Sequence, residues 1–208
     1  MRVVVVDYGA GNLHSVARAL RHEGADVVVS SAPDEVSRAN RLVLPGVGAF
    51  ADAMQELSRR NLVEPVKRFL EAERPFLGIC VGMQMLLGES MEFGRHAGLG
   101  VVPGTVVRIP ADRGVKVPHV GWSSIRPSRE GAWNGTCLAG LEEQAPMVYF
   151  VHSYNAEPED EEHRLADAWH GDIRICAAVR RHSAVGVQFH PEMSGAVGLA
   201  ILRRFLSS

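Results

Sequence analysis

The sequence has few cysteines, and they do not form a recognisable set. Three of them (Cys80, Cys137 and Cys176) are spread through 208 residues, with no Cys-x-x-Cys pair among them. An odd number at such spacings is typical neither of a disulfide framework nor of a zinc knuckle. We therefore expect free thiols in a reducing compartment, and we expect no metal ion and no cofactor.

Charge of one sign and long apolar runs are also missing. Lys and Arg number 22 against 24 Asp and Glu, which gives a formal net charge of -2. Such a balance lacks the basic surface that nucleic acids or anionic membranes attract. Apolar runs such as Val3–Val6 are far shorter than the roughly 20 residues of a spanning helix. We therefore expect a cytoplasmic protein that binds neither nucleic acid nor membrane.

The apolar pattern of the first half predicts an α/β fold in a single domain over residues 1–208. Short apolar runs without alternation, typical of parallel strands buried on both faces, occupy 2–6, 27–29, 42–44 and 76–79. Helical spacing separates them at 13–20, 33–39 and 50–73, with a break expected before Pro65. This alternation predicts an open, mainly parallel sheet with helices on both faces.

The pattern of expected secondary structure changes in the second half of the sequence. Strand-like runs follow one another with few helical intervals, and we expect them to add antiparallel strands to the same sheet. A last amphipathic helix should close the chain at 197–205. The expected strands cover 101–109, 115–117, 147–151, 164–169, 173–179 and 184–189.

The most informative segment joins a buried strand to a helix through Gly78-Ile79-Cys80-Val81-Gly82. Glycines two residues before and after a nucleophile allow the sharp turn of a nucleophile elbow. The thiolate of Cys80 would then gain from the following helix, and the N–H of Val81 could meet a developing oxyanion. The alternative is a buried structural cysteine between packing glycines. The other two cysteines have no such frame.

A nucleophile needs a base, and the segment Val187-Gln188-Phe189-His190-Pro191-Glu192 offers one. If the chain stays extended, Glu192 lies on the same side as His190 and can fix its tautomer. Cys80, His190 and Glu192 would then form an acyl-transfer triad. Alone, a His-Pro-Glu triplet is more often a solvated turn. The remaining histidines lack a comparable partner, although His119 and His152 stand in unusual contexts.

A third glycine cluster, Pro45-Gly46-Val47-Gly48, follows the third expected strand. In an open α/β sheet, loops at the carboxyl ends of the strands line the ligand crevice. Two glycines permit a peptide that can turn the N–H of Val47 inward as a second oxyanion donor. The alternative, a phosphate-binding loop, lacks the Lys-Ser/Thr of a P-loop.

Taken together and in this order, the three segments resemble the triad-type (class I) glutamine amidotransferases. The resemblance spans residues 1 to about 206 and implies a flavodoxin-like fold that hydrolyses glutamine to glutamate and ammonia. By position it implies a catalytic triad of Cys80, His190 and Glu192, and oxyanion donors at Val47 and Val81. It also implies glutamine-binding positions at Gly48, Gln84, Glu92, His152, Ser153 and Tyr154.

Further strings are similar to the glutaminase subunits of the synthase that closes the imidazole ring in histidine biosynthesis. The resemblance implies a heterodimer in which ammonia passes to a separate cyclase subunit built as a (β/α)8 barrel. His119–Trp122 and Tyr149 would face that partner and line the route of the ammonia. The strings are Asp7–Leu13, Pro45–Phe50, Pro118–Trp122, Phe150–Tyr154 and Gly186–Glu192.

Two positions depart from that pattern. The family usually has Asn where this chain has Ser123, and Lys where it has Met193. The resemblance implies that both face the partner rather than the glutamine pocket. Three alternatives remain: the glutaminase of pyridoxal phosphate synthesis, expected to carry Gly-Gly-Glu-Ser in the oxyanion loop; a catalytically silent subunit on the same fold; and a free-standing cysteine peptidase.

Overall fold

The core of the molecule is a parallel sheet that ends on one side in antiparallel strands. The structure, a computed structural model, describes the backbone of residues 1–208 and every side chain except that of Arg113. Apolar and β-branched residues fill the central parallel strands, which are buried on both faces, whereas the edge strand at 26–30 leaves Val29 exposed; the predicted mainly parallel sheet is confirmed. In spatial order these strands are β2 (Asp26–Ser30), β1 (Arg2–Val6), β3 (Leu42–Gly46), β4 (Phe76–Cys80) and β14 (Ala184–Val187).

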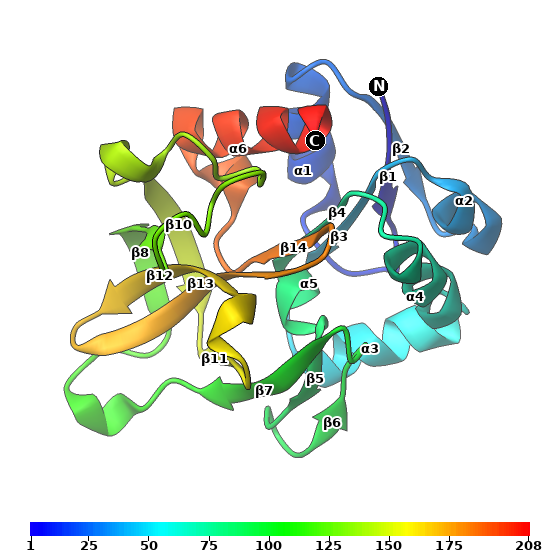
Figure 1. Ribbon diagram of the computed structural model, residues 1–208. Helices are drawn as coiled ribbons and strands as arrows, with labels where there is room; N and C mark the ends of the chain where they lie inside the picture. Colours follow the sequence, from blue (N-terminus) through cyan, green and yellow to red (C-terminus); the bar gives the residue numbers. More distant parts are fainter.

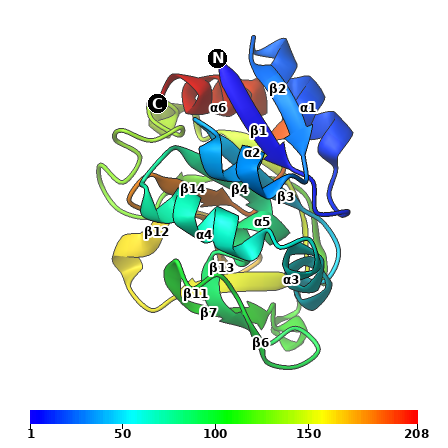
Figure 2. The same ribbon diagram turned by 90° about the vertical axis from the view of Figure 1, so that its right-hand side faces the viewer.

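Helices cover both faces of this sheet (Figures 1 and 2). On one face lie α1 (Leu13–His22) and α6 (Gly195–Ser207); on the other lie α2 (Pro33–Arg38) and α4 (Val63–Glu71), preceded by α3 (Phe50–Arg59). The expected break ahead of Pro65 is confirmed, because the chain leaves the helix after α3 and starts α4 at Val63. Pro65 then sits in the first turn of α4, where its missing N–H is not needed.

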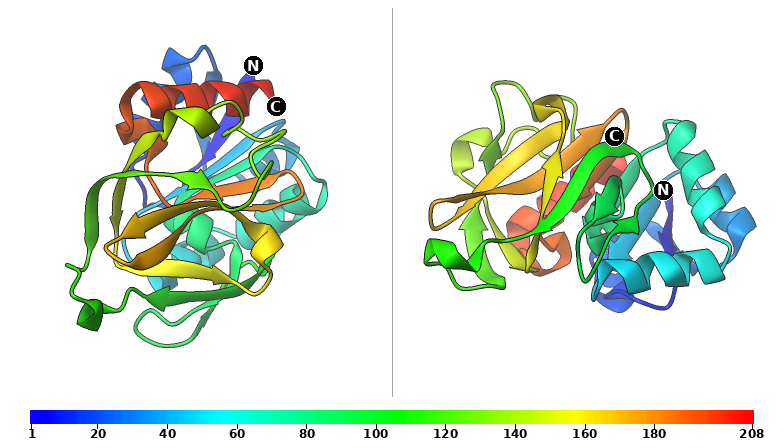
Figure 3. Two further views of the ribbon diagram at one scale, coloured as in Figure 1. Left: turned by 60° about the vertical axis from the view of Figure 1, so that its left-hand side comes forward. Right: turned by 90° about the horizontal axis from the view of Figure 1, so that it is seen from below.

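Antiparallel strands extend the sheet beyond β14, as expected. β13 (Ile173–Arg181) pairs with β14, then β12 (Arg164–His170) with β13, and the two-residue β9 (Arg126–Pro127) forms the edge. The long β12–β13 ribbon projects away from the parallel strands (Figures 1 and 3). Pro127 cannot donate a ladder hydrogen bond, so the sheet ends there.

The remaining strands correct the expectation of a single sheet. β5 (Leu87–Ser90), β6 (His96–Ala97), β7 (Val102–Arg108) and β11 (Tyr154–Pro158) form a separate sheet. The expected strand at 115–117 is not a strand, because Pro118 follows it and cannot join a ladder. Short 3₁₀ helices, η1 to η4, lie at Ala111–Arg113, Glu142–Gln144, Glu161–His163 and Pro191–Met193.

A third, two-stranded sheet pairs β8 (His119–Ser124) with β10 (Met147–His152), and we call it the β8–β10 ribbon. Opposite residues share one face, because side chains alternate along each strand. The outward face is largely apolar and includes Val120 and Trp122 opposite Val151 and Tyr149. The inward face carries buried residues, among them His119 opposite His152.

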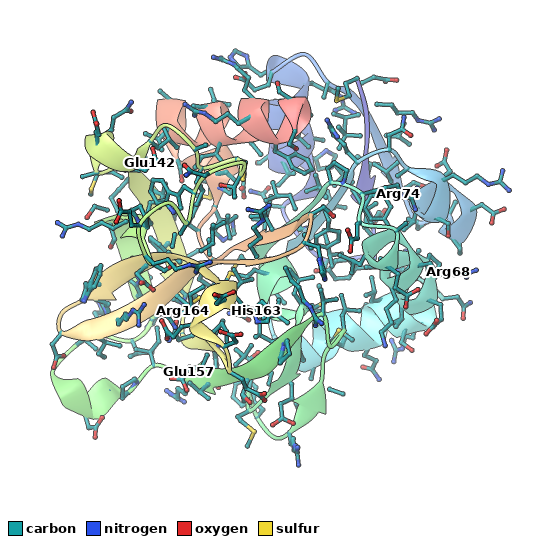
Figure 4. The ribbon with its side chains drawn as sticks, in the orientation of Figure 1. Arg68, Arg74, Glu142, Glu157, His163 and Arg164 are labelled. Atoms are coloured by element: carbon teal, nitrogen blue, oxygen red, sulfur yellow. The ribbon has the colours of Figure 1, made fainter. Side chains whose placement is uncertain are left out.

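A cluster of buried ion pairs joins the antiparallel strands β12 and β13. Arg164, labelled in Figure 4, and Arg174 both bind the buried carboxylate of Asp167, each through an Nη2–O distance of 2.7 Å. Removing one partner of such a buried group leaves an uncompensated charge, so the three residues lock β12 to β13. Among the described residues no helix is long and apolar enough to cross a membrane.

Candidate active site

Cys80 ends β4 in a strained backbone conformation, with φ of 55° and ψ of -112°. A non-glycine residue at positive φ costs free energy and persists only where its surroundings impose it. Here the surroundings are glycines. A Cβ on Gly82 would lie 1.8 Å from the carbonyl oxygen of Leu44, and one on Gly78 would lie 2.6 Å from the carbonyl oxygen of Gly82. The predicted elbow is therefore present, and close backbone packing holds it.

The helix that follows the elbow is shorter than the sequence suggested. α5 covers only Val81–Gln84, a single turn, so it supplies little of the macrodipole expected to stabilise a thiolate. A side chain supplies a local donor instead. The amide of Gln188 directs its Nε2 at the Sγ of Cys80, at 3.6 Å. Gln188 is completely buried, and Gln84 fixes its orientation by donating to its Oε1 at 2.9 Å.

His190 and Glu192 form the expected pair. The Nδ1 of His190 lies 2.8 Å from Oε1 of Glu192, and both side chains are buried. The connection is not the extended chain that the sequence suggested, because Pro191–Met193 forms the turn η4. Ser194 fixes the backbone of His190. Its Oγ donates to the backbone oxygen of His190 and accepts from the N–H of Tyr149.

The charge state of His190 follows from its two neighbours. Burial alone would lower the pKa of His190, but hydrogen bonding to Cys80 and Glu192, supported by their electrostatic interaction with the ring, outweighs burial and raises the pKa to about 10. Since Nδ1 is bound to Glu192, Nε2 is the ring atom left for Cys80. The arrangement favours an imidazolium beside the thiol of Cys80, and a positive charge beside a thiol is the setting in which cysteine nucleophiles are activated.

The glycine loop after β3 is fixed at its base and open at its tip. The hydroxyl of Tyr8 donates to the backbone oxygen of Pro45 at 2.8 Å, and burial beside Cys80 raises the pKa of that hydroxyl. Beyond this anchor, Val47 is 41% exposed and Gly48 has φ of 88°. The carboxylate of Glu92 accepts from the N–H of Phe50 at 2.6 Å and so fixes the start of α3 behind the loop.

These residues surround a cavity of about 420 Å³ at the carboxyl ends of the parallel strands. Every predicted site residue lines it except Glu192, which lies behind His190. The expectation that Met193 faces away from this pocket is wrong, because Met193 lines the cavity. Ser123 does not line the cavity, and its Oγ lies 2.9 Å from Nε2 of His119. The lining residues are Asn12, Val47, Gly48, Cys80, Val81, Gln84, Glu92, Pro118, Val151, His152, Ser153, Tyr154, His190 and Met193.

The sequence interpretation overlooked three contributors, Tyr8, Asn12 and Gln188. Each lies inside a string that the resemblance used, but composition gave no reason to single it out. Asn12 follows β1, so the rule that strand carboxyl ends meet at one edge could have found it. Tyr8 and Gln188 act through partners 37 and 108 positions away, and nothing local indicates such contacts.

The other two thiols lie in different surroundings. Cys137 and Cys176 are buried, and burial raises the pKa of each thiol to about 12. A thiol in that state is a weak nucleophile at neutral pH. The described side chains also contain no cluster of His, Cys, Asp and Glu that could hold a metal ion.

Comparisons with known proteins agree with this geometry. The family model "Glutamine amidotransferase class-I" matches residues 4–208. The chain is 47% identical over 210 residues to imidazole glycerol phosphate synthase subunit HisH 1 of Legionella pneumophila, with 98% of each chain covered. It is 44% identical to the HisH subunit of Geobacter sulfurreducens, with 98% of this chain and 97% of that one covered.

A plant relative is a longer protein. The chloroplastic imidazole glycerol phosphate synthase hisHF of Arabidopsis thaliana is 43% identical, and the match covers 98% of this chain but 34% of that one. Among solved structures, PurLQS of Thermotoga maritima is similar with a TM-score of 0.76 and 19% identity, covering 99% of this chain and 97% of that one. At that identity the likeness concerns the fold, an α/β fold with a large, mainly parallel sheet.

Proposed function

The chain belongs to the class-I glutamine amidotransferase family, and on that premise we propose that it is the glutaminase subunit of an imidazole glycerol phosphate synthase. The observation that carries the proposal is the meeting of the Cys80 elbow with the His190–Glu192 pair at one cavity. Full-length relatives named as HisH subunits support the assignment to histidine biosynthesis.

In the proposed reaction the thiolate of Cys80 attacks the side-chain amide carbon of glutamine. His190 gives its proton to the leaving nitrogen, so that ammonia departs and a thioester remains. Water then attacks the thioester, its proton returns to His190, and glutamate leaves. Glu192 keeps the Nδ1–H of His190 in place and stabilises the imidazolium without taking the proton.

We assign the stabilisation of the oxyanion to the backbone N–H groups of Val81 and Val47, which would donate hydrogen bonds to it. Val81 follows the nucleophile directly, and Val47 lies on the exposed tip of the glycine loop. Removing one oxyanion donor typically costs about 10²- to 10³-fold in rate. If the N–H of Val47 turns toward the oxyanion only when the partner subunit is docked, glutamine hydrolysis would depend on that partner. Glutamine would lie against Gly48, Gln84, Glu92 and the segment His152–Tyr154.

The proposed partner is a cyclase subunit with a (β/α)8 barrel, which uses the ammonia to form imidazole glycerol phosphate and aminoimidazole ribotide. In the plant relative one chain carries the combined name hisHF. We place the docking surface on the outward face of the β8–β10 ribbon, where Val120 and Trp122 are both more than half exposed. Exposed apolar patches of this kind are typical of protein interfaces. The location proposed is the cytoplasm.

The test is steady-state glutaminase activity of the chain alone, with the cyclase subunit, and with cyclase and its nucleotide ligand. We expect low activity alone and a rise of about 10²-fold or more in the full complex, the size of one oxyanion donor. Full activity in the isolated chain, unchanged by either addition, would contradict the coupling. Absence of glutamine hydrolysis under all three conditions would contradict the function.

A further inference from the structure

Two histidines on the inward face of the β8–β10 ribbon form a cross-strand pair outside the triad. Nδ1 of His119 lies 3.1 Å from Nε2 of His152, and both rings are buried. The ring of His119 is stacked between Phe150, at 4.8 Å between centroids, and His170, at 4.3 Å. The pair is therefore held in one orientation by packing as well as by hydrogen bonding.

The hydrogen bonds assign the proton on each ring. Nδ1 of His152 lies 2.8 Å from the backbone oxygen of Tyr154, which can only accept, so Nδ1 carries the proton. Nε2 of a neutral His152 must then accept from Nδ1 of His119. In turn, Nε2 of His119 accepts from the hydroxyl of Ser123 at 2.9 Å. All three donations run in one direction, toward the Tyr154 carbonyl.

Both rings stay neutral, as this chain of donors requires. Burial and the neighbouring His170 lower the pKa of His119 to about 4. Burial lowers the pKa of His152 to about 3 and outweighs the opposing hydrogen bond to Tyr154, and His119, His170 and His190 add smaller lowering contributions. At neutral pH each ring therefore offers one donor and one acceptor.

The Tyr154 carbonyl is a shared acceptor. Besides Nδ1 of His152, it receives Nε2 of Gln84 at 3.4 Å. The same Nε2 donates to Gln188, whose own amide nitrogen faces the Sγ of Cys80. A continuous series of hydrogen bonds thus runs from Ser123, on the strand that carries the exposed Trp122, to the nucleophile.

We propose that His119 and His152 are positioning residues, which hold the Tyr154 carbonyl where it orients Gln84 for the substrate glutamine. This inference rests on the proposed glutaminase function. The two strands that carry the outward face of the β8–β10 ribbon also carry this pair. A shift of the ribbon on docking would therefore move the Tyr154 carbonyl and the glutamine pocket together.

Asparagine and glutamine variants of His152 separate its two hydrogen bonds. In His152→Asn the amide nitrogen stands near the former Nδ1 and keeps the donor to Tyr154, but the contact with His119 is lost. In His152→Gln the amide group stands near the former Nε2 and keeps the contact with His119, but the donor to Tyr154 is lost. Each variant matches the other in polarity and serves as its control.

We expect kcat/KM for glutamine, measured in the complex with cyclase, to be about tenfold higher in His152→Asn than in His152→Gln, with the loss mainly in KM. Alkylation of Cys80 by iodoacetamide, which needs no glutamine pocket, should be alike in both. Equal kcat/KM values, or a larger loss in His152→Asn, would overturn the proposal.

A second measurement separates this proposal from the proposed function. Glutamine binding, measured by calorimetry in a Cys80→Ala background, needs no turnover, and we expect the same tenfold order of affinities there. If wild type hydrolyses no glutamine while this order holds, the function fails and the positioning role stands. If wild type is active and the affinities are equal, the positioning role fails alone.

His119 provides a second pair should the His152 variants not fold. In His119→Asn the amide nitrogen stands near the former Nδ1 and can still donate to His152. In His119→Gln the amide group stands near the former Nε2, so only the contact with Ser123 is kept. We expect glutamine to bind more tightly to the Asn variant than to the Gln variant, by about threefold, since His119 acts through His152. The reverse order, or no difference, would also overturn the proposal.

Discussion

Buried histidines near the same cavity differ in the direction of their pKa shifts, and so in the charge that they carry at neutral pH. His190 has its pKa raised to about 10, whereas the pKa of His119 falls to about 4 and that of His152 to about 3. All three are buried, so burial does not explain the difference. His190 is bound to a carboxylate and its pKa also responds to the Cys80 thiol, while His152 is bound to an imidazole and a backbone carbonyl. The chemistry of the partner, rather than depth, decides which ring can carry a proton for catalysis.

The largest effect should come from removing His190 itself or the thiol beside it. We expect Cys80→Ala or His190→Ala to lower glutaminase kcat by at least about 10⁴-fold, because each removes a reacting group of the proposed triad. Steady-state ammonia release measures the effect. Cys137→Ser and Cys176→Ser are the matched controls and should keep activity. If either control abolished activity while Cys80→Ala retained it, the nucleophile would be misassigned.

Replacing the carboxylate of Glu192 should have the next largest effect. Glu192→Gln gives His190 a neutral partner, as His152 has, and we expect kcat to fall by about 10²- to 10⁴-fold but by less than in His190→Ala. The same assay, with circular dichroism as the check on folding, ranks the two variants. Equal and complete losses would indicate a direct chemical role for Glu192, and an unchanged rate would point to another orienting group.

The opposite pKa shifts also predict opposite effects of pH on stability. His119 and His152 have folded pKa values below the unfolded value of about 6.5, so their unfolded forms take up protons first as pH falls. Their contribution therefore lowers the free energy of unfolding from about pH 6.5 down to about pH 4 and 3. His190 has the reverse sign, and its contribution is lost between about pH 6.5 and 10.

Urea unfolding at pH 6.5 and pH 5 tests the acid side. We expect the unfolding free energy of wild type to fall more than that of His152→Asn, by about 2 kcal/mol over this interval, because asparagine takes up no proton. His22→Asn, at an exposed position at the end of α1, serves as a control and should follow wild type. Parallel curves for wild type and His152→Asn would mean that His152 is not held neutral.

The smallest expected effect lies at the outer end of the hydrogen-bond series. Ser123→Ala removes the donor to Nε2 of His119, but the site is only half buried and water can replace the hydroxyl. We expect kcat/KM to fall by about twofold, and Ser123→Asn, which restores a donor, to lose less. A tenfold loss in Ser123→Ala would place the critical contact at Ser123 rather than at the Tyr154 carbonyl.

Much of this arrangement could be predicted because it depends on residues that are close together in the sequence. The short apolar runs of β1, β3 and β4 are typical of strands buried on both faces, and glycines at 78 and 82 allow the backbone of Cys80 to turn. His190 and Glu192 are two residues apart, so their contact needed only a suitable turn. The separate sheets were not predictable, because strand-like runs do not say which strand they join.

The parallel core, the turn at Cys80 and the contact between His190 and Glu192 thus follow from local sequence pattern. The folded chain alone shows that Gln188 turns its amide nitrogen to the thiol, that Met193 lines the cavity and that His152 stays neutral. The orientation of an amide and the proton on an imidazole depend on partners that the fold brings from distant positions, such as Gln84 for Gln188 and His119 for His152.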